Sequence, residues 1–160
     1  MPAINGHTLY NAGGTGVTEI VDIANGTATS NCNIDVRVLQ VITIAVNSFT
    51  SVGISDINRL CAGLVEGAGT TSWHYKDGGG HAVDFSVLNG HALTGDDSSS
   101  RRLLQILDPV MPTGSGAGQI ECRSGNPLAT QHLHQFEDTC NHQHIDVGGA
   151  AGGLAGQSAS

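Results

Sequence analysis

The sequence contains few basic residues: 6 Lys and Arg stand against 14 Asp and Glu, which gives a formal net charge of -8. Binding to nucleic acid or to an anionic lipid surface depends on clustered basic side chains, so we expect neither kind of partner. Long hydrophobic runs are lacking as well. The longest, VLQVITIAV, contains Gln and Thr and is far shorter than the ~20 apolar residues of a membrane helix. We therefore expect no membrane insertion and a ligand that is neutral or polar.

Aromatic residues make up only 4% of the 160 residues, whereas hydrophobic residues as a whole make up 39%. The core must therefore consist mainly of Val, Ile, Leu and Ala, and the length is sufficient for one domain of modest size. Composition divides the chain into three parts. We expect an N-terminal arm over residues 1–33, a folded domain over 34–148 and a flexible tail rich in Gly, Ala and Ser over 149–160.

No CxxC pair occurs among the four cysteines, which argues against a zinc ribbon. Two disulfides are expected instead, and three connectivities are possible. The most local choice pairs Cys32 with Cys61 and Cys122 with Cys140, while the alternative is four buried thiols in a cytosolic protein. No signal peptide is visible at the N-terminus. We therefore expect an extracytoplasmic protein whose leader was removed, or one released by another route such as phage lysis or virion assembly.

Two helices are predicted. Residues 33–49 show an apolar stripe at helical spacing, and Asn33 or Asp35 can cap the start. The stripe consists of Val36, Leu39, Ile42, Val46 and Phe49. Residues 95–112 begin with Asp and Ser, which favour a helix start, and Pro109 ends the pattern.

Five short segments rich in β-branched residues are predicted to be strands or, for the first, an extended arm. They are residues 17–23, 51–60, 81–87, 118–123 and 141–147. Strands that are not consecutive, combined with two main helices, indicate an α+β fold. We expect a small single domain whose central antiparallel sheet carries the functional site and is flanked by the two helices.

Side chains of metal-binding types surround three glycines in SWHYKDGGGHAVDF, residues 72–85. His74 precedes the glycines, and Asp84 lies on the strand predicted after them. Asp84 shares a strand face with Ala82, which leaves room for a metal or a substrate. The glycines let the loop bend so that His74 and Asp84 converge. Catalytic zinc usually takes three protein ligands of these types and leaves one position for water.

A second group of polar residues lies in the last predicted strand. His142 and His144 are two residues apart, so both side chains point to the same face, ~7 Å from each other. One can bind a metal while the other reaches the attacking water or the substrate. Asp146 continues this face and can orient an imidazole. The two segments together predict a zinc site.

Two alternatives for the ligands stay open. His81 lies in the first segment and can replace His74, although on the strand it would point away from Asp84. His132 and His134 form an earlier His-x-His pair, which competes with the later one. The later pair is preferred because the β-branched residues that follow it favour a strand.

The pattern Ser72-x-His74, Gly80-x-Ala82-x-Asp84 and His-x-His resembles the D-alanyl-D-alanine metallopeptidases, a zinc peptidase family grouped with lysostaphin-type enzymes and hedgehog domains that includes phage endolysin peptidases. The resemblance covers roughly residues 34–148. Two departures stand out: the segment between His74 and Gly80 is three residues longer than usual, and Asn141 occupies the position where many members have Glu. The chain is therefore similar to the His-x-His branch.

The resemblance implies roles for the matching positions. The implied zinc ligands are His74, Asp84 and His144. His142 would be the catalytic His, which assists deprotonation of water or stabilises the transition state. Arg59 would hold the scissile carbonyl or a substrate carboxylate.

Further residues near these positions have alternative roles. Ser72 would brace the site by hydrogen bonding, and Tyr75 either contacts the substrate or covers the loop. Glu137 and Asp138 are candidates for the general base if His142 does not serve as one, or they are solvated loop carboxylates.

The resemblance implies a zinc-dependent peptidase that hydrolyses amide bonds in bacterial peptidoglycan. The bond would lie in a stem peptide or a cross-link, which makes the enzyme a D,D-carboxypeptidase or an endopeptidase. Such a protein would be phage-encoded or secreted, and the tail after residue 148 can attach it to another domain or to a phage particle. The alternative is a catalytically silent, zinc-containing module that binds the wall or builds a virion.

Overall fold

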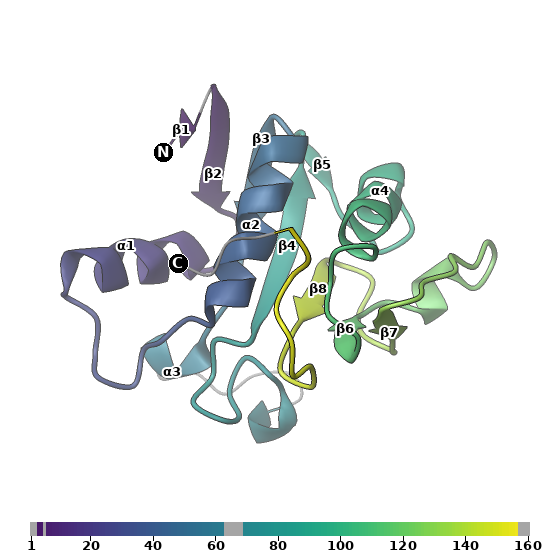
Figure 1. The fold of residues 1–160 in the computed structure, drawn as a ribbon. Helices are drawn as coiled ribbons and strands as arrows, with labels where there is room; N and C mark the ends of the chain where they lie inside the picture. The colour runs from purple at the N-terminus through teal and green to yellow at the C-terminus, as the bar shows by residue number, and fades with distance from the viewer. Residues whose placement is uncertain (1–2, 5, 63–68, 157–160) are drawn as a thin grey trace.

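The computed structural model describes residues 3–4, 6–62 and 69–156 of the chain (Figure 1). These residues form one mixed sheet with helices packed against it, so the predicted α+β class is confirmed. The helices are α1 (Gly16–Asn25), α2 (Val36–Ser48), α3 (Arg59–Ala62) and α4 (Ser98–Leu107), with 3₁₀ turns η1 (Gly69–Thr71) and η2 (Glu121–Arg123). The strands are β1 (Ala3–Ile4), β2 (His7–Asn11), β3 (Ser51–Ile54), β4 (Ala82–Leu88), β5 (His91–Ala92), β6 (Ser115–Ala117), β7 (Leu133–Gln135) and β8 (Gln143–Asp146).

The strand order in the sheet is β1-β2-β3-β4-β8-β6-β7, and β5 pairs with β4 outside this path. The pairs β2–β3 and β6–β7 are parallel, whereas β4 is antiparallel to both β3 and β8. In the β4–β8 pair, Asp84 lies opposite His144 and Ala82 lies opposite Asp146. This register brings together polar residues that are sixty positions apart in the sequence.

The two predicted main helices are confirmed, and each begins at the expected kind of cap. The Asp35 carboxylate accepts a hydrogen bond from the Arg37 backbone N–H at the start of α2, and the Asp97 carboxylate accepts one from Ser100 at the start of α4. Figure 1 shows α2 lying across one face of the sheet. Val83 and Phe85 of β4 belong to the apolar core on that face. Asp84, between them in the strand, therefore faces the other side.

Three of the strand predictions need correction. Residues 17–23 belong to α1: Val17 is buried and Gly26 provides a left-handed C-cap whose N–H bonds the carbonyls of Asp22 and Ile23. Residues 118–123 are no strand, because Gln119 has a left-handed backbone with φ of +71° and a 3₁₀ turn follows. The strand predicted over 51–60 ends at Ile54, and α3 begins at Arg59.

The apolar core includes side chains from both segments that flank the predicted domain. Leu9, Val17 and Leu154 all belong to the same buried cluster. Arg37 also donates to the backbone carbonyls of Ala150 and Gly152 at 2.7 and 2.9 Å. The predicted boundaries of the functional domain, after residue 33 and after residue 148, stay a prediction. The structure itself shows residues from both flanking segments packed on the sheet and on α2.

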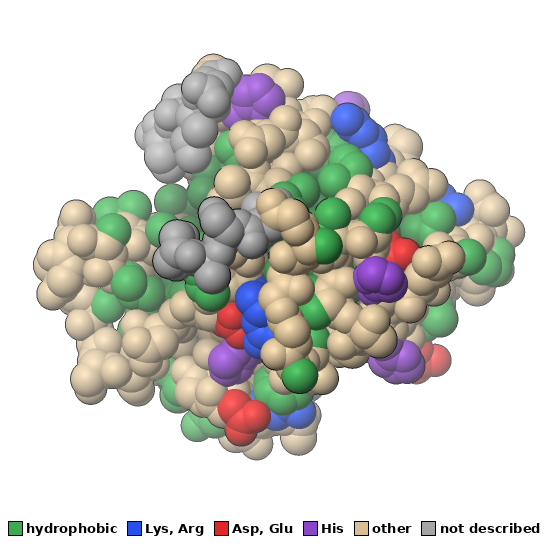
Figure 2. Space-filling view, viewed as in Figure 1, with side chains coloured by type: hydrophobic (Ala, Val, Ile, Leu, Met, Phe, Trp, Pro, Cys, Tyr) green, Lys and Arg blue, Asp and Glu red, His purple; other side chains and the backbone are tan. Residues whose placement is uncertain are grey.

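Few charged side chains cover the molecule. The face in Figure 2 shows scattered blue and red side chains among tan and green ones. This agrees with the low content of charged residues, 12% of the sequence. None of the described helices is both long and apolar enough to cross a membrane.

Two disulfides are present, Cys32–Cys61 and Cys122–Cys140, so the most local of the predicted pairings is confirmed. The first links the loop before α2 to α3. The second links η2 to the loop that precedes β8 and carries His142. Both bonds therefore fix segments that lie outside the sheet.

Removal of either disulfide is expected to destabilise the protein. The bonds close loops with sequence separations of 29 and 18, for which chain entropy gives roughly 3 kcal/mol each. We expect this loss of unfolding free energy in a Cys32→Ser/Cys61→Ser variant and in a Cys122→Ser/Cys140→Ser variant, measured by denaturant unfolding. If reducing agent left the stability of the natural chain unchanged, the bonds would not contribute in solution.

Candidate metal centre

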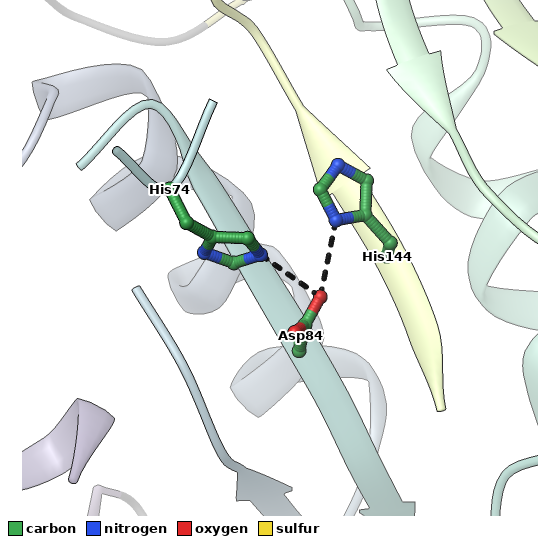
Figure 3. Close-up of side chains that lie close together, drawn as sticks. All are labelled: His74, Asp84 and His144. Carbon is green, nitrogen blue, oxygen red and sulfur yellow. Dashed lines mark hydrogen bonds and ion pairs between the residues drawn. The ribbon is translucent and has the colours of Figure 1, made fainter. Parts of the chain in front are cut away.

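Three ligand atoms converge on one point of the sheet face opposite α2 (Figure 3). His74 comes from the loop after η1, Asp84 from β4 and His144 from β8. Asp84 Oδ1 lies 3.1 Å from His74 Nε2 and 3.1 Å from His144 Nδ1. All three side chains are buried, and their ligand atoms lie within 4.8 Å of one another.

Hydrogen bonds on the far side of each imidazole determine which nitrogen is free to bind a metal. His74 Nδ1 donates to the Ile57 carbonyl at 2.8 Å, because a carbonyl can only accept. His144 Nε2 lies 2.9 Å from the Asp146 carboxylate and donates to it. His74 Nε2 and His144 Nδ1 are therefore the nitrogens that face Asp84. A protonated nitrogen there donates a hydrogen bond to the carboxylate, and an unprotonated one offers its lone pair to a cation. Two imidazole nitrogens and a carboxylate oxygen at one point can therefore hold a cation.

The same hydrogen bonds and charges shift the pKa values of these residues. Burial by itself raises the pKa of Asp84, but the imidazoles of His74 and His144 outweigh burial and hold that pKa well below its usual range. Burial lowers the pKa of His144, but its hydrogen bonds to Asp146 and Asp84 raise it to about 10. Asp84 thus stays ionised, and positive charge is favoured at the centre of the group.

The donor set fits a metal ion. Two imidazole nitrogens and one carboxylate oxygen are the ligands of many catalytic metal sites in which a further coordination position is left for water or substrate. The second hydrogen bond of each imidazole is the usual support for such ligands. His74, Asp84 and His144 can therefore hold a metal ion, as the sequence predicted.

The glycine loop brings His74 to Asp84 through a close backbone approach. Gly79 and Gly80 have φ of +69° and +75°, and a Cβ would lie 2.2 Å from Asn58 Oδ1 and 2.1 Å from the Asn33 carbonyl, respectively. Asn58 Nδ2 donates to the carbonyls of Asn33 and Gly78. Only glycine fits both the backbone conformation and the space at these two positions, so these glycines allow the loop to take this path.

The ligand group lies in the wall of a cavity of about 970 Å³. The cavity is lined by the β2–α1 loop (12–15), the segments 55–59 and 71–74, and residues of β4, β6, β8 and the 134–142 segment. This volume is at the upper end of the range for sites that enclose a small organic ligand, ~300–1,000 Å³. The ligand group is therefore reachable by a small molecule.

His142 is beside the ligand group, but it lies in the turn before β8 and not on the strand as predicted, because β8 begins at Gln143. Its Nε2 lies 3.5 Å from Asp84 Oδ1, 3.1 Å from Asp138 Oδ2 and 3.2 Å from Gln119 Nε2. Its Nδ1 donates to Asn141 Oδ1 at 2.7 Å. Burial lowers the pKa of His142, but the hydrogen bond to Asp138 outweighs burial and raises it above the ordinary value. His142 is thus a proton-accepting group next to the metal ligands.

The other predicted site residues lie in different places. The Ser72 hydroxyl accepts from the His74 backbone N–H at 3.2 Å, which is the position of a bracing residue. Arg59 lines the cavity, and its Nε donates to Asp56 at 2.9 Å. Tyr75 is not among the described residues that line the cavity, and its backbone N–H bonds the Ser72 carbonyl.

The alternative ligands lie outside the group. His81 Nδ1 lies 2.9 Å from Asp35 Oδ2, away from Asp84 as its strand position predicted. His132 Nδ1 donates to the Met111 carbonyl at 2.6 Å. His134 lines the cavity and is exposed, and it is not part of the ligand group. The later His-x-His pair therefore contributes the histidine of the candidate ligand group, His144.

Sequence reasoning missed Gln119. This buried residue accepts a hydrogen bond from the His144 backbone N–H at 3.0 Å and contacts His142 through its amide nitrogen. It lies more than twenty positions before either histidine, and no local pattern marks it. Its backbone is left-handed, with φ of +71°, and its side chain reaches the backbone of β8.

Loss of the carboxylate behind His144 is expected to weaken metal binding. The Asp146 side chain occupies space that Gly116 leaves open, since a Cβ there would lie 2.4 Å from Asp146 Oδ2. Removal of such supporting carboxylates typically costs 10–100-fold in metal affinity. We expect this loss for Asp146→Ala in a titration against a competing chelator. Asp96→Ala, at a surface carboxylate, is the control. Equal affinities of both variants would contradict the supporting role.

Comparisons with protein-family models, with curated protein sequences and with solved structures found no match. Any function of this chain must therefore be inferred from the residues of the site themselves.

Proposed function

We propose that this chain is a zinc-dependent peptidase that hydrolyses amide bonds in bacterial peptidoglycan, in stem peptides or in cross-links. One observation carries the proposal. His74, Asp84 and His144 present three ligand atoms in the wall of a cavity, and His142 stands beside them with its Nε2 3.5 Å from Asp84 Oδ1. Metal-assisted hydrolysis uses a metal held with an open position and a nearby group that transfers the proton, and these four residues can supply both.

Zinc is the metal that this donor set favours, because two imidazoles and one carboxylate are among its usual catalytic ligands. When bound, zinc polarises the substrate carbonyl and lowers the pKa of a coordinated water toward ~7. His74 and Asp84 come from opposite ends of the glycine loop, and His144 comes from the neighbouring strand. The sheet therefore holds Asp84 and His144, and the glycine loop holds His74.

The chain's own residues handle the proton. Asn141 holds His142 Nδ1, so Nε2 faces the ligand group and takes a proton from the attacking water. Asp138 Oδ2, 3.1 Å from this Nε2, stabilises the resulting imidazolium. His142 then gives the proton to the departing amine. Arg59, whose Nε is held by Asp56, is placed at the cavity wall to bind a substrate carbonyl.

Peptidoglycan as the substrate is supported by the resemblance of the motifs to the D-alanyl-D-alanine metallopeptidases and by the disulfides. Two disulfides in a chain of this size favour an oxidising compartment. A secreted or phage-encoded enzyme that acts on the cell wall would have both these motifs and an oxidising environment for its disulfides. The acidic net charge of -8 provides no attraction to anionic wall polymers, so targeting through an attached domain or a particle fits the same proposal.

A second candidate function is a zinc-containing module without catalysis, which binds the wall or builds a virion. The position of His142 favours it, because its Nε2 lies 3.5 Å from Asp84 Oδ1, near enough to serve as a fourth ligand. Structural zinc sites have four protein ligands and no open position.

Metal analysis of the purified protein, paired with mass spectrometry of digested cell walls, tests the proposal. We expect one zinc per chain and a new peptide terminus that chelator abolishes. Zinc without cleavage would favour the silent module. Absence of any bound metal after incubation with zinc would contradict both functions.

A further inference from the structure

The cavity extends to both sides of the ligand group. Two of the ligands, Asp84 and His144, lie on β4 and β8, in the middle of the strand order. On one side the cavity continues past β3 to the β2–α1 loop (12–15), and on the other it continues past β6 to His134 on β7. Strands are ~4.8 Å apart, so the distance from β2 to β7 is roughly 24 Å. At ~3.3 Å per residue, an extended peptide has room for roughly three residues on each side of the metal.

The charges along the cavity disfavour a free carboxylate. The described residues that line it include five acidic ones: Asp56, Asp84, Glu137, Asp138 and Asp146. Among the same residues, Arg59 is the only Lys or Arg. Arg59 Nε already donates to Asp56. Even with a divalent cation bound, carboxylates are in excess. An enzyme that removes a C-terminal residue must bind a terminal carboxylate close to the scissile bond, and this lining would repel it.

We propose that the site cuts within a peptide and does not remove a terminal residue. This inference rests on the proposed peptidase function and narrows its substrate to chains that continue on both sides of the scissile bond. Hydrolysis breaks the amide C–N bond and adds the oxygen of water to the carbonyl carbon. It leaves a new carboxylate on one fragment and a new amine on the other. The new carboxylate forms among acidic side chains, which favours release of that fragment.

Gly13 gives direct access to one end of the cavity. It lines the cavity in the β2–α1 loop with φ of +86°, and a Cβ there would meet nothing within 4 Å. Asn tolerates this backbone region better than most residues, so Gly13→Asn adds a side chain without a clash. Gly26 is a matched control: it has φ of +72°, is equally open, and lies at the end of α1 away from the cavity.

Two synthetic peptides test the inference on the zinc-loaded protein. One is a stem pentapeptide that ends in a free D-Ala-D-Ala carboxylate, and the other is the same peptide extended by two glycines and amidated. We expect internal cleavage of the extended peptide, with kcat/KM at least about tenfold higher than for release of the terminal D-Ala. Gly13→Asn should raise KM for the extended peptide about tenfold with unchanged zinc content, and Gly26→Asn should not.

The outcomes separate the two proposals. Faster release of the terminal D-Ala would overturn the internal-cutting inference and keep the peptidase. An unchanged KM in Gly13→Asn would also overturn the inference, because the peptide would not reach the β2–α1 loop. If zinc binds but neither the peptides nor purified walls are cut, the peptidase proposal fails and the inference fails with it.

Discussion

Replacement of Asp84 by Asn is expected to abolish zinc binding and wall hydrolysis together. Asp84 Oδ1 is the shared partner of both imidazoles, at 3.1 Å from each, and supplies the only formal negative charge among the three ligands. An amide at this position binds a metal poorly and leaves two imidazoles without their counter-charge. Because metal assistance is worth several kcal/mol of barrier, we expect activity to fall by about 10³-fold or more.

The measurement combines elemental analysis with digestion of purified cell walls. Asp96→Asn serves as the control, since that carboxylate lies at the surface and pairs with Arg101. Asp84 faces the cavity and not the apolar core, so the variant should remain folded, which circular dichroism can check. A folded Asp84→Asn protein with one zinc and normal cleavage would remove the ligand group from the proposed function.

The ligand group was predictable because it depends on local periodicity. Alternation along β4 places Asp84 opposite the core-facing Val83 and Phe85, and alternation along β8 gives His144 and Asp146 one face. When β4 and β8 pair in one sheet, Asp84 and His144 lie next to each other on the same face of it. The glycines before β4 indicated a sharp bend. These signals lie within fifteen residues of each ligand, so the sequence contains them.

The surroundings of the group were not predictable in the same way. Gln119 supports β8 through a left-handed backbone that no neighbouring residue signals. The β2–α1 loop forms a cavity wall only because β2 pairs in parallel with β3, across some forty residues of sequence. α1 was missed because β-branched residues in 17–23 favoured a strand, whereas the tertiary contacts of Val17 and the Gly26 cap determine a helix. Long-range pairing decides these features, and one sequence does not reveal it.

The remaining large effect concerns His142, and it separates the peptidase from the silent module. His142→Ala removes the proton acceptor but none of the three ligands, so zinc content should stay at one per chain. Loss of a general acid–base group typically costs 10²–10⁴-fold, and we expect kcat for wall or peptide cleavage to fall within that range. His91→Ala, at an exposed histidine on β5, is the control and should cleave normally.

The zinc content of the His142→Ala variant decides the role of this residue. If the variant lost zinc, His142 would be the fourth ligand, and a closed coordination sphere leaves no position for water or substrate. The short distance from His142 Nε2 to Asp84 Oδ1, 3.5 Å, would then belong to a structural site. If zinc stayed and cleavage persisted, the proton would pass through another group, and Asp138 at 3.1 Å from His142 would be the next candidate. Retained zinc with lost cleavage is the result that only an open catalytic site explains, because zinc held by three protein ligands needs His142 for proton transfer and not for binding.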